Sequence, residues 1–261
     1  MIAVGVVIVA AASISAIVWE YKHFYEFSLL GLVLLLAPSV PAGAFSGKRI
    51  ARLYVLFFGA GLVVDLLLGI TITQSWYYNY SSVFEYIVLY TWIYPLGGFV
   101  MAQSYLVARR VFKASSTHEK HIDLKVFWIA FSIPAAVTIG SLIFKDQLIF
   151  SQWSPIMAVS AALMLCAAAA LRSELRGKRS YLRDLISAPW QTVLATLLAT
   201  YINLPIHEYP NVYAREWVYV PATGTFLDSH IIGIAVLYWL MWPLLVVGSM
   251  SLYYRTEDAK K

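Results

Sequence analysis

Charge is scarce in this chain of 261 residues, of which 13% are charged and 61% are hydrophobic. In an ordinary soluble domain about a quarter of the residues are charged. The shortage excludes such a domain and predicts an all-α integral membrane protein, because helices satisfy their own backbone hydrogen bonds within lipid. The net charge of +5 comes from basic residues that lie between the apolar runs. Such residues orient helices in a bilayer, so we expect membrane lipid rather than nucleic acid as the partner.

Cysteine and the common catalytic motifs are also lacking. The single cysteine, Cys166, lies in an apolar run, so no intrachain disulfide can form. The sequence has no HExxH or CxxC spacing, no Gly-x-Ser-x-Gly segment and no lysine placed within an apolar run to hold a retinal Schiff base. We therefore set aside those enzyme classes, and we expect no cofactor.

What the chain does have is a series of apolar runs, each long enough to cross roughly 30 Å of hydrocarbon. They predict eight transmembrane helices, at residues 2–18, 27–46, 53–73, 83–107, 126–144, 147–171, 185–205 and 231–254. Alternate connections hold 16 of the 19 lysine and arginine residues, and the others hold Lys22, Lys145 and Arg215. Because basic loops stay in the cytoplasm, this pattern predicts a multi-pass protein of the cell membrane with both termini cytoplasmic.

Similar segments occur at equivalent places in the two halves of the chain. SGKRIARLY (46–54) and RGKRSYLRD (176–184) share Gly-Lys-Arg, and Trp76-x-Tyr78 is repeated as Trp217-x-Tyr219. These matches predict two parallel four-helix repeats, residues 1–107 and 126–261, joined by a cytoplasmic linker at 108–125. The alternative is that basic inner loops and aromatic outer belts resemble one another in any membrane protein.

Polar and small residues follow helical spacing in three of the runs. The seventh run has Thr192, Thr196, Thr200, Asn203 and His207 on one face, the third has Gly61, Asp65, Gly69 and Thr73, and the fourth has Glu85, Tyr86, Tyr90 and Tyr94. We expect these faces to enclose a cavity in the outer half of the membrane. The alternative is close helix packing without a ligand.

Asp65 is the most informative of these residues, because an aspartate at mid-span costs about 2.5–3.5 kcal/mol on insertion scales. It therefore predicts either a functional acid or a hydrogen bond to neighbouring threonine or tyrosine hydroxyls. Hydroxyl, amide and imidazole groups at similar depth are its candidate partners, and these are Tyr90, Thr200, Asn203 and His207.

Residues 206–230 contain many ionisable and aromatic side chains between two apolar runs, and they predict an outer cap. Trp217 belongs to its aromatic belt, and Glu208 and Arg215 are placed to form an ion pair. His207, Glu208, Asp228 and His230 have metal-ligand chemistry, but they lack a recognised spacing. The sequence therefore assigns no metal site.

Asp65 in a span, followed by Trp76-x-Tyr78 and an aromatic helix, resembles the repeated membrane domains of the heterodimeric-type lycopene cyclases. The resemblance covers about 45 residues in each half. Where those cyclases have a Pro-x-Glu-Glu-type motif, this chain has Pro95-Leu96-Gly97-Gly98. The resemblance implies a hydrophobic isoprenoid substrate, with Asp65 or Glu85 protonating an alkene. Tyr90, Tyr94 and Trp217 would then line the substrate site and stabilise the carbocation.

Two other functions fit the same pattern. Parallel repeats with a titratable Asp65 also suit a proton-coupled transporter or flippase of a small solute or lipid. A non-enzymatic membrane subunit would need the polar faces only for helix packing.

Overall fold

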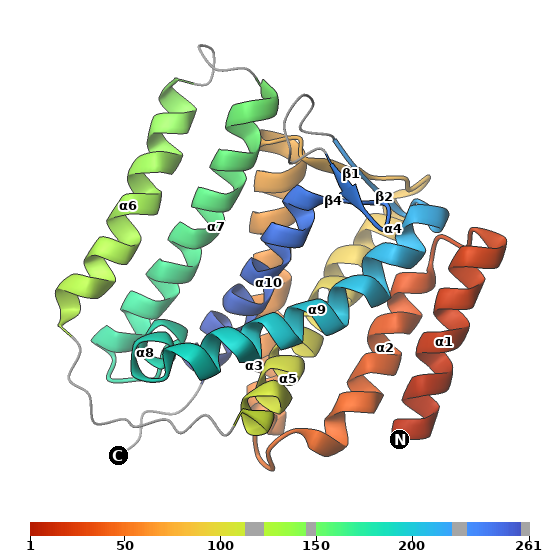
Figure 1. The fold of residues 1–261 in the computed structure, drawn as a ribbon, viewed down its shortest axis with the longest axis horizontal. Helices are drawn as coiled ribbons and strands as arrows, with labels where there is room; N and C mark the ends of the chain where they lie inside the picture. Colours follow the sequence, from red (N-terminus) through yellow and green to blue (C-terminus); the bar gives the residue numbers. More distant parts are fainter. Residues whose placement is uncertain (113–122, 145–149, 221–228, 257–261) are drawn as a thin grey trace.

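The computed structural model describes residues 1–112, 123–144, 150–220 and 229–256, and these residues are mainly helical (Figure 1). The helices are α1 (Ile2–Trp19), α2 (Phe24–Leu36), α3 (Gly47–Ala60), α4 (Val83–Val88), α5 (Tyr94–Val111), α6 (Leu124–Ile143), α7 (Phe150–Leu175), α8 (Tyr181–Ser187), α9 (Pro189–Ala214) and α10 (Val236–Arg255). A 3-10 turn, η1 (Ala37–Ser39), follows α2. Two π-helical segments, η2 (Gly61–Ile72) and η3 (Leu89–Ile93), continue α3 and α4.

Six helices are long and apolar enough to cross a membrane. They are α1, α3 with η2, α4 with η3 and α5, α6, the part of α7 from Ile156 to Leu175, and α10. Only 17% of the residues of α1 and of α6 are buried within the protein, so most of their apolar side chains face outward. Such surfaces need hydrocarbon rather than water around them. The chain is therefore a multi-pass membrane protein.

Each of the eight apolar runs overlaps a helix, but the helices of the second and seventh runs are not among the six. The second run gives the short apolar helix Phe24–Ser39, which ends before Pro41. The seventh run gives α8 and α9, and these are not among the six apolar helices. In addition, α9 continues through Pro205 and Pro210 to Ala214. The first part of the predicted cap is therefore helical. Its side toward α1, α5 and α10 is buried, whereas Tyr209, Val212 and Tyr213 are exposed.

Two small antiparallel sheets, which the sequence did not predict, lie at one end of the helices (Figure 1). Strand β1 (Trp76–Tyr78) pairs with β2 (Trp217–Tyr219), and β3 (His230–Ile231) pairs with β4 (Ile234–Ala235). In the first sheet, called the aromatic ribbon below, Trp76 lies opposite Tyr219 and Tyr78 lies opposite Trp217. The ribbon therefore joins segments that are about half the chain apart.

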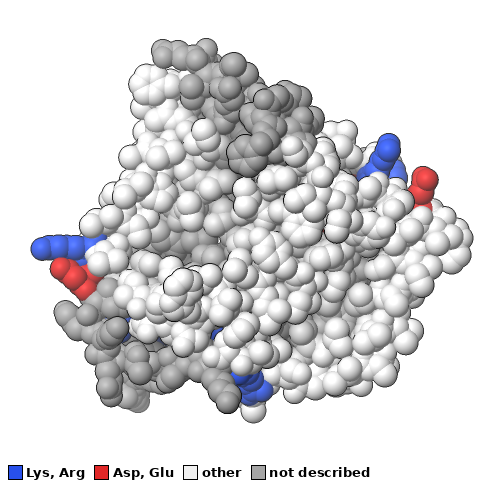
Figure 2. Space-filling view, viewed as in Figure 1, with Lys and Arg blue, Asp and Glu red and all other residues white. Residues whose placement is uncertain are grey.

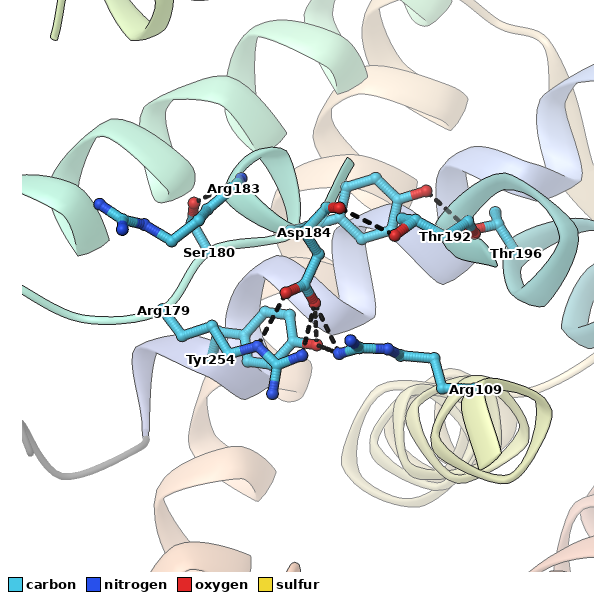
Figure 3. A network of polar contacts seen from close by, with 9 residues as sticks. Arg109, Arg179, Ser180, Arg183, Asp184, Thr192, Thr196 and Tyr254 are labelled. Atoms are coloured by element: carbon cyan, nitrogen blue, oxygen red, sulfur yellow. Dashed lines mark hydrogen bonds and ion pairs between the residues drawn. The ribbon is translucent and has the colours of Figure 1, made fainter. Parts of the chain in front are cut away.

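The opposite end holds the start of α1 and the end of α10 (Figure 1). Here the buried carboxylate of Asp184 on α8 accepts hydrogen bonds from three side chains (Figure 3). They are Arg109 on α5, Arg179 just before α8, and Tyr254 on α10. The distances to the two arginines are 2.8–3.0 Å. This network links α5, α8 and α10 at what we call the basic end. Figure 2 shows few charged side chains among the described residues of the viewed face, most of them near its margins, so its middle suits contact with lipid.

Candidate functional site

The π-helical segment η2 brings Asp65 under the aromatic ribbon. Gly61, Asp65 and Gly69 are its buried residues, as their spacing of four predicted, and Asp65 is 1% exposed. The segment ends at Ile72, and Gln74, with a positive φ of 48°, lies in the turn that leads into β1. The i→i+5 bonding of π-helices is uncommon and is often found at functional sites.

Three aromatic side chains donate hydrogen bonds to the Asp65 carboxylate. Trp76 Nε1 and Tyr78 OH donate to Oδ1 at 2.6 and 3.2 Å, and Tyr90 OH donates to Oδ2 at 2.8 Å. Tyr94 lies next to them, with its hydroxyl 3.1 Å from that of Tyr78 and its ring stacked on Tyr90. The structure thus brings Asp65, Tyr90 and Tyr94 together.

Glycines on either side of Asp65 make room for these rings. A Cβ atom at Gly61 would lie 2.7 Å from the ring of Tyr94, and one at Gly69 would lie 2.1 Å from the ring of Trp76. Both distances are too short for atoms that are not bonded. The glycines in the third apolar run therefore allow the rings of Tyr94, at the start of α5, and of Trp76, on β1, to approach the backbone.

Pro95 helps to form the second π-helical segment, beside Tyr90. Proline has no N–H group, so it cannot donate to the carbonyl of Thr91 four residues earlier. That carbonyl instead accepts a hydrogen bond of 2.6 Å from Tyr54 on α3. The chain is π-helical from Leu89 to Ile93, just before the proline.

A second buried carboxylate, Glu208 on α9, lies under the other strand of the ribbon. Trp217 Nε1 donates to Oε2 at 3.3 Å, Trp242 Nε1 on α10 donates to Oε1 at 2.9 Å, and Tyr219 OH also donates to Oε1. Glu208 is 2% exposed. As at Asp65, a Trp-x-Tyr strand and an aromatic residue of the following helix supply the donors.

Glu208 lines a cleft of about 420 Å³. The aromatic residues Trp217, Tyr219 and Tyr238 line it too, and the exposed residues Arg215 and His230 lie at its rim. The rings of Tyr219 and Tyr238 are stacked, with their centroids 3.4 Å apart. Asp65 is not among the residues that line this cleft. A buried carboxyl beside aromatic faces and open space can deliver a proton to an apolar molecule.

The polar face of α9 is buried, but its residues contact other groups than Asp65. Asn203 Nδ2 donates to Ser104 Oγ on α5 at 2.8 Å. His207 packs edge-on against Tyr25 and stacks on Trp242. The hydroxyl of Thr200 and both ring nitrogens of His207 are buried without a hydrogen-bond partner among the described residues.

Glu85 lies at the surface, where its carboxylate caps the start of α4 by accepting from the backbone N–H of Ser81 and of Ser82 at 2.8 and 2.7 Å. Its Oε1 also lies 3.4 Å from Nε2 of His23. This geometry makes Glu85 a capping residue of α4.

Beside Glu85, the side chains of His23, Glu26 and Glu216 converge, with one potential ligand atom of each within 4.8 Å of the others. Burial, together with the negative charge of Glu26, holds the pKa of Glu216 well above its ordinary value. This is not the metal group that the predicted cap suggested. His207 and Glu208 contact aromatic rings, His230 is exposed, and Asp228 lies outside the described residues.

From the sequence, Glu208 is expected to form an ion pair with Arg215, whereas in the structure it accepts hydrogen bonds from Trp217, Tyr219 and Trp242. Its resemblance to Asp65 was hidden because it precedes Trp217 by nine residues, whereas Asp65 precedes Trp76 by eleven. The common signal was a carboxylate followed by Trp-x-Tyr in each half.

Comparison with known proteins finds no matching family model, no similar curated protein and no similar solved structure.

Proposed function

We propose that this protein is a membrane enzyme that isomerises an isoprenoid-type lipid by proton transfer from Glu208. One observation carries the proposal. The Glu208 carboxyl is buried among three aromatic donors and forms part of the wall of a cleft of about 420 Å³. The acid that this geometry favours is Glu208, rather than the Asp65 or Glu85 that the sequence suggested.

The surroundings of Glu208 favour a carboxyl that holds a proton. Burial disfavours the charged form of a carboxyl, and the described partners of Glu208 are neutral tryptophan and tyrosine side chains. Oε1 accepts two hydrogen bonds, whereas Oε2 accepts the longer one from Trp217. We therefore place the acidic proton on Oε2.

The reaction needs no oxidant or reductant. Glu208 adds its proton to one carbon of an alkene, and the electron pair of the double bond forms the new C–H bond and leaves a carbocation. The Glu208 carboxylate then removes a proton from a neighbouring carbon, which moves the double bond and restores the acid. Trp217, Tyr219 and Tyr238 line the cleft, and an aromatic face that meets the cation would stabilise it by about 0.5–2 kcal/mol.

We also propose that the two carboxylate pockets arose by duplication of a four-helix unit, residues 1–107 and 126–254. Equivalent helices make equivalent contacts: α1 packs on α2 as α6 packs on α7, and α2 packs on α5 as α7 packs on α10. Likewise α3 packs on α5 as α9 packs on α10. The register of the ribbon has the two-fold symmetry that a rotation about the membrane normal would produce. In this arrangement α2 and α9 complete an eight-helix bundle, and the basic end faces the cytoplasm.

The proposal is tested by adding isoprenoid polyenes to the purified protein in nanodiscs made up in D2O. We expect an isomer of the added lipid that carries deuterium at carbon, detected by mass spectrometry. Glu208→Gln should lower the rate at least about 100-fold, as expected for loss of a general acid. Glu20→Gln is the control, because Glu20 is exposed and does not line the cleft.

Three results would count against the enzyme. One is a Glu208→Gln variant that retains the wild-type rate. Another is an added lipid that the wild-type protein neither converts nor retains in native mass spectrometry. The third is movement of an unchanged lipid or solute across proteoliposomes that depends on Glu208, which would instead identify a transporter.

A further inference from the structure

We infer that His23, Glu26 and Glu216 form a binding site for a divalent transition-metal ion at the ribbon end, and that Glu85 orients the histidine. The site lies outside the Glu208 cleft and does not depend on the proposed isomerase chemistry. It joins the start of α2 to the segment between α9 and β2, two parts of the chain that are nearly 200 residues apart.

Local structure brings the three groups to one point. His23 is the residue that precedes α2, and Glu26 lies in the first turn three residues later, so their side chains share a face. The distance from His23 Nδ1 to Glu26 Oε1 is 3.1 Å. Glu216 follows Arg215, whose positive φ of 52° ends α9 and turns the chain toward β2.

Two carboxylate oxygens in this cluster need a partner. Oε2 of Glu26 and Oε2 of Glu216 are buried without a hydrogen-bond partner among the described residues. Glu216 is 0% exposed, and its other oxygen accepts a hydrogen bond of 2.7 Å from Tyr80. A buried carboxylate oxygen without a donor or cation is unfavourable, and a shared cation would satisfy both oxygens at once.

The histidine is held as metal-bound histidines usually are. Such a histidine binds the metal through one ring nitrogen and donates the N–H of the other to a carboxylate or carbonyl. Here Nδ1 faces Glu26, and Nε2 lies 3.4 Å from Glu85 Oε1. The ring of His23 also stacks on Tyr80 at 6.2 Å between centroids. Glu85 thus has a second role beside capping α4.

The ligand chemistry selects the class of ion. One imidazole nitrogen and two carboxylates suit zinc and related first-row transition ions, whereas calcium and magnesium prefer oxygen ligands alone. Three protein ligands leave a coordination position open, and the half-buried His23 gives access from solvent. Zinc is therefore the first probe.

The test measures Zn²⁺ bound to the full-length protein in detergent after treatment with EDTA and desalting. We expect one zinc per chain in the wild type, measured by mass spectrometry of the metal and by competition with a chromophoric chelator. Glu216→Gln should remove the bound zinc, and Glu85→Gln should weaken binding about 10- to 100-fold, the range for loss of an orienting partner. His230→Gln, an exposed histidine at the same end, is the matched control and should bind as the wild type does.

A second measurement keeps the inference testable if Glu216→Gln does not fold. X-ray absorption at the zinc edge of the wild type should show nitrogen and oxygen ligands at about 2.0–2.2 Å. Sulfur in the coordination shell would point to Cys166 and overturn the site. So would a wild type that binds less than about a tenth of an equivalent of zinc at micromolar free metal, or a His230→Gln variant that loses the zinc.

Discussion

Gly69 is the position around Asp65 with the least room for a side chain. The ring of Trp76 occupies the space that a Cβ atom would need, and the same ring donates the 2.6 Å hydrogen bond to Asp65. Gly69→Ala should therefore push the indole away from the carboxylate. We expect a loss of about 1–3 kcal/mol in the free energy of unfolding, the usual cost of overpacking. A change in tryptophan fluorescence should accompany it.

Gly59 provides the matched control for this substitution. It lies in α3, the helix that leads into η2, and a Cβ atom there would meet nothing within 4 Å. Gly59→Ala should leave the fluorescence unchanged and should stabilise the helix slightly, since alanine is favoured over glycine by about 1 kcal/mol in helices. Equal effects at the two glycines would mean that Trp76 does not lie against Gly69.

At the scale of elements, the pairing of the ribbon can be tested by a disulfide between Tyr77 and Val218, which lie opposite each other. In a background of Cys166→Ser, the double variant Tyr77→Cys with Val218→Cys should oxidise readily. Opposite residues in antiparallel strands are about 4.5–5.5 Å apart at Cα, within the range that a disulfide spans. After proteolysis between the two positions, the fragments should stay linked until they are reduced.

The control for the disulfide moves one cysteine along the strand. Tyr77→Cys with Val220→Cys is out of register by two residues, so it should form much less of the linked product. If both pairs oxidise equally, the strands are not held in this register.

The sequence predicted the helices whose positions follow from apolar runs alone. All eight apolar runs contain helices, and the buried face of η2 follows the predicted spacing of four. Both features depend only on residues that are close together in the sequence. The end of α9 was predicted too early, since Pro205 and Pro210 are poor helix residues locally and tertiary packing holds them in the helix. The ribbon was missed because its strands pair across more than a hundred residues. The partners of Glu208 come from β2 and from α10, and the sequence alone does not show that these segments meet α9.

At the scale of the whole molecule, the Asp184 network should be a large local source of stability. Asp184→Ala removes the buried carboxylate and leaves the Arg109 and Arg179 charges without it. Loss of one partner of a buried ion pair costs about 3–5 kcal/mol. We expect a drop of this size in the free energy of unfolding, measured by denaturant titration in mixed micelles.

Tyr254→Phe is the graded comparison, because it removes one neutral donor to Asp184 and keeps both arginines. Its effect should be about 1.5–3 kcal/mol, the range for a hydrogen bond to a charged group. If Asp184→Ala lowers the free energy of unfolding no more than Tyr254→Phe does, the ion pairs of Asp184 add no stability.

The orientation of the molecule is tested with single cysteines in the Cys166→Ser background. Ser115→Cys lies in the predicted cytoplasmic linker, and Ser81→Cys lies at the exposed start of α4 at the ribbon end. An impermeant thiol reagent added to intact cells should label position 81 and leave position 115 unlabelled until the membrane is opened. The reverse pattern would invert the topology.

The register of the ribbon gives the two carboxylate pockets a mechanical connection. Trp76, a donor to Asp65, lies across the strands from Tyr219, a donor to Glu208, and their rings meet edge to face at 6.4 Å between centroids. Because the two rings are in contact, we expect a rotation of either one to displace the other. A molecule held in the cleft beside Glu208 would alter the hydrogen bonds of Asp65 without touching it, so the two halves would respond to one ligand as a coupled pair.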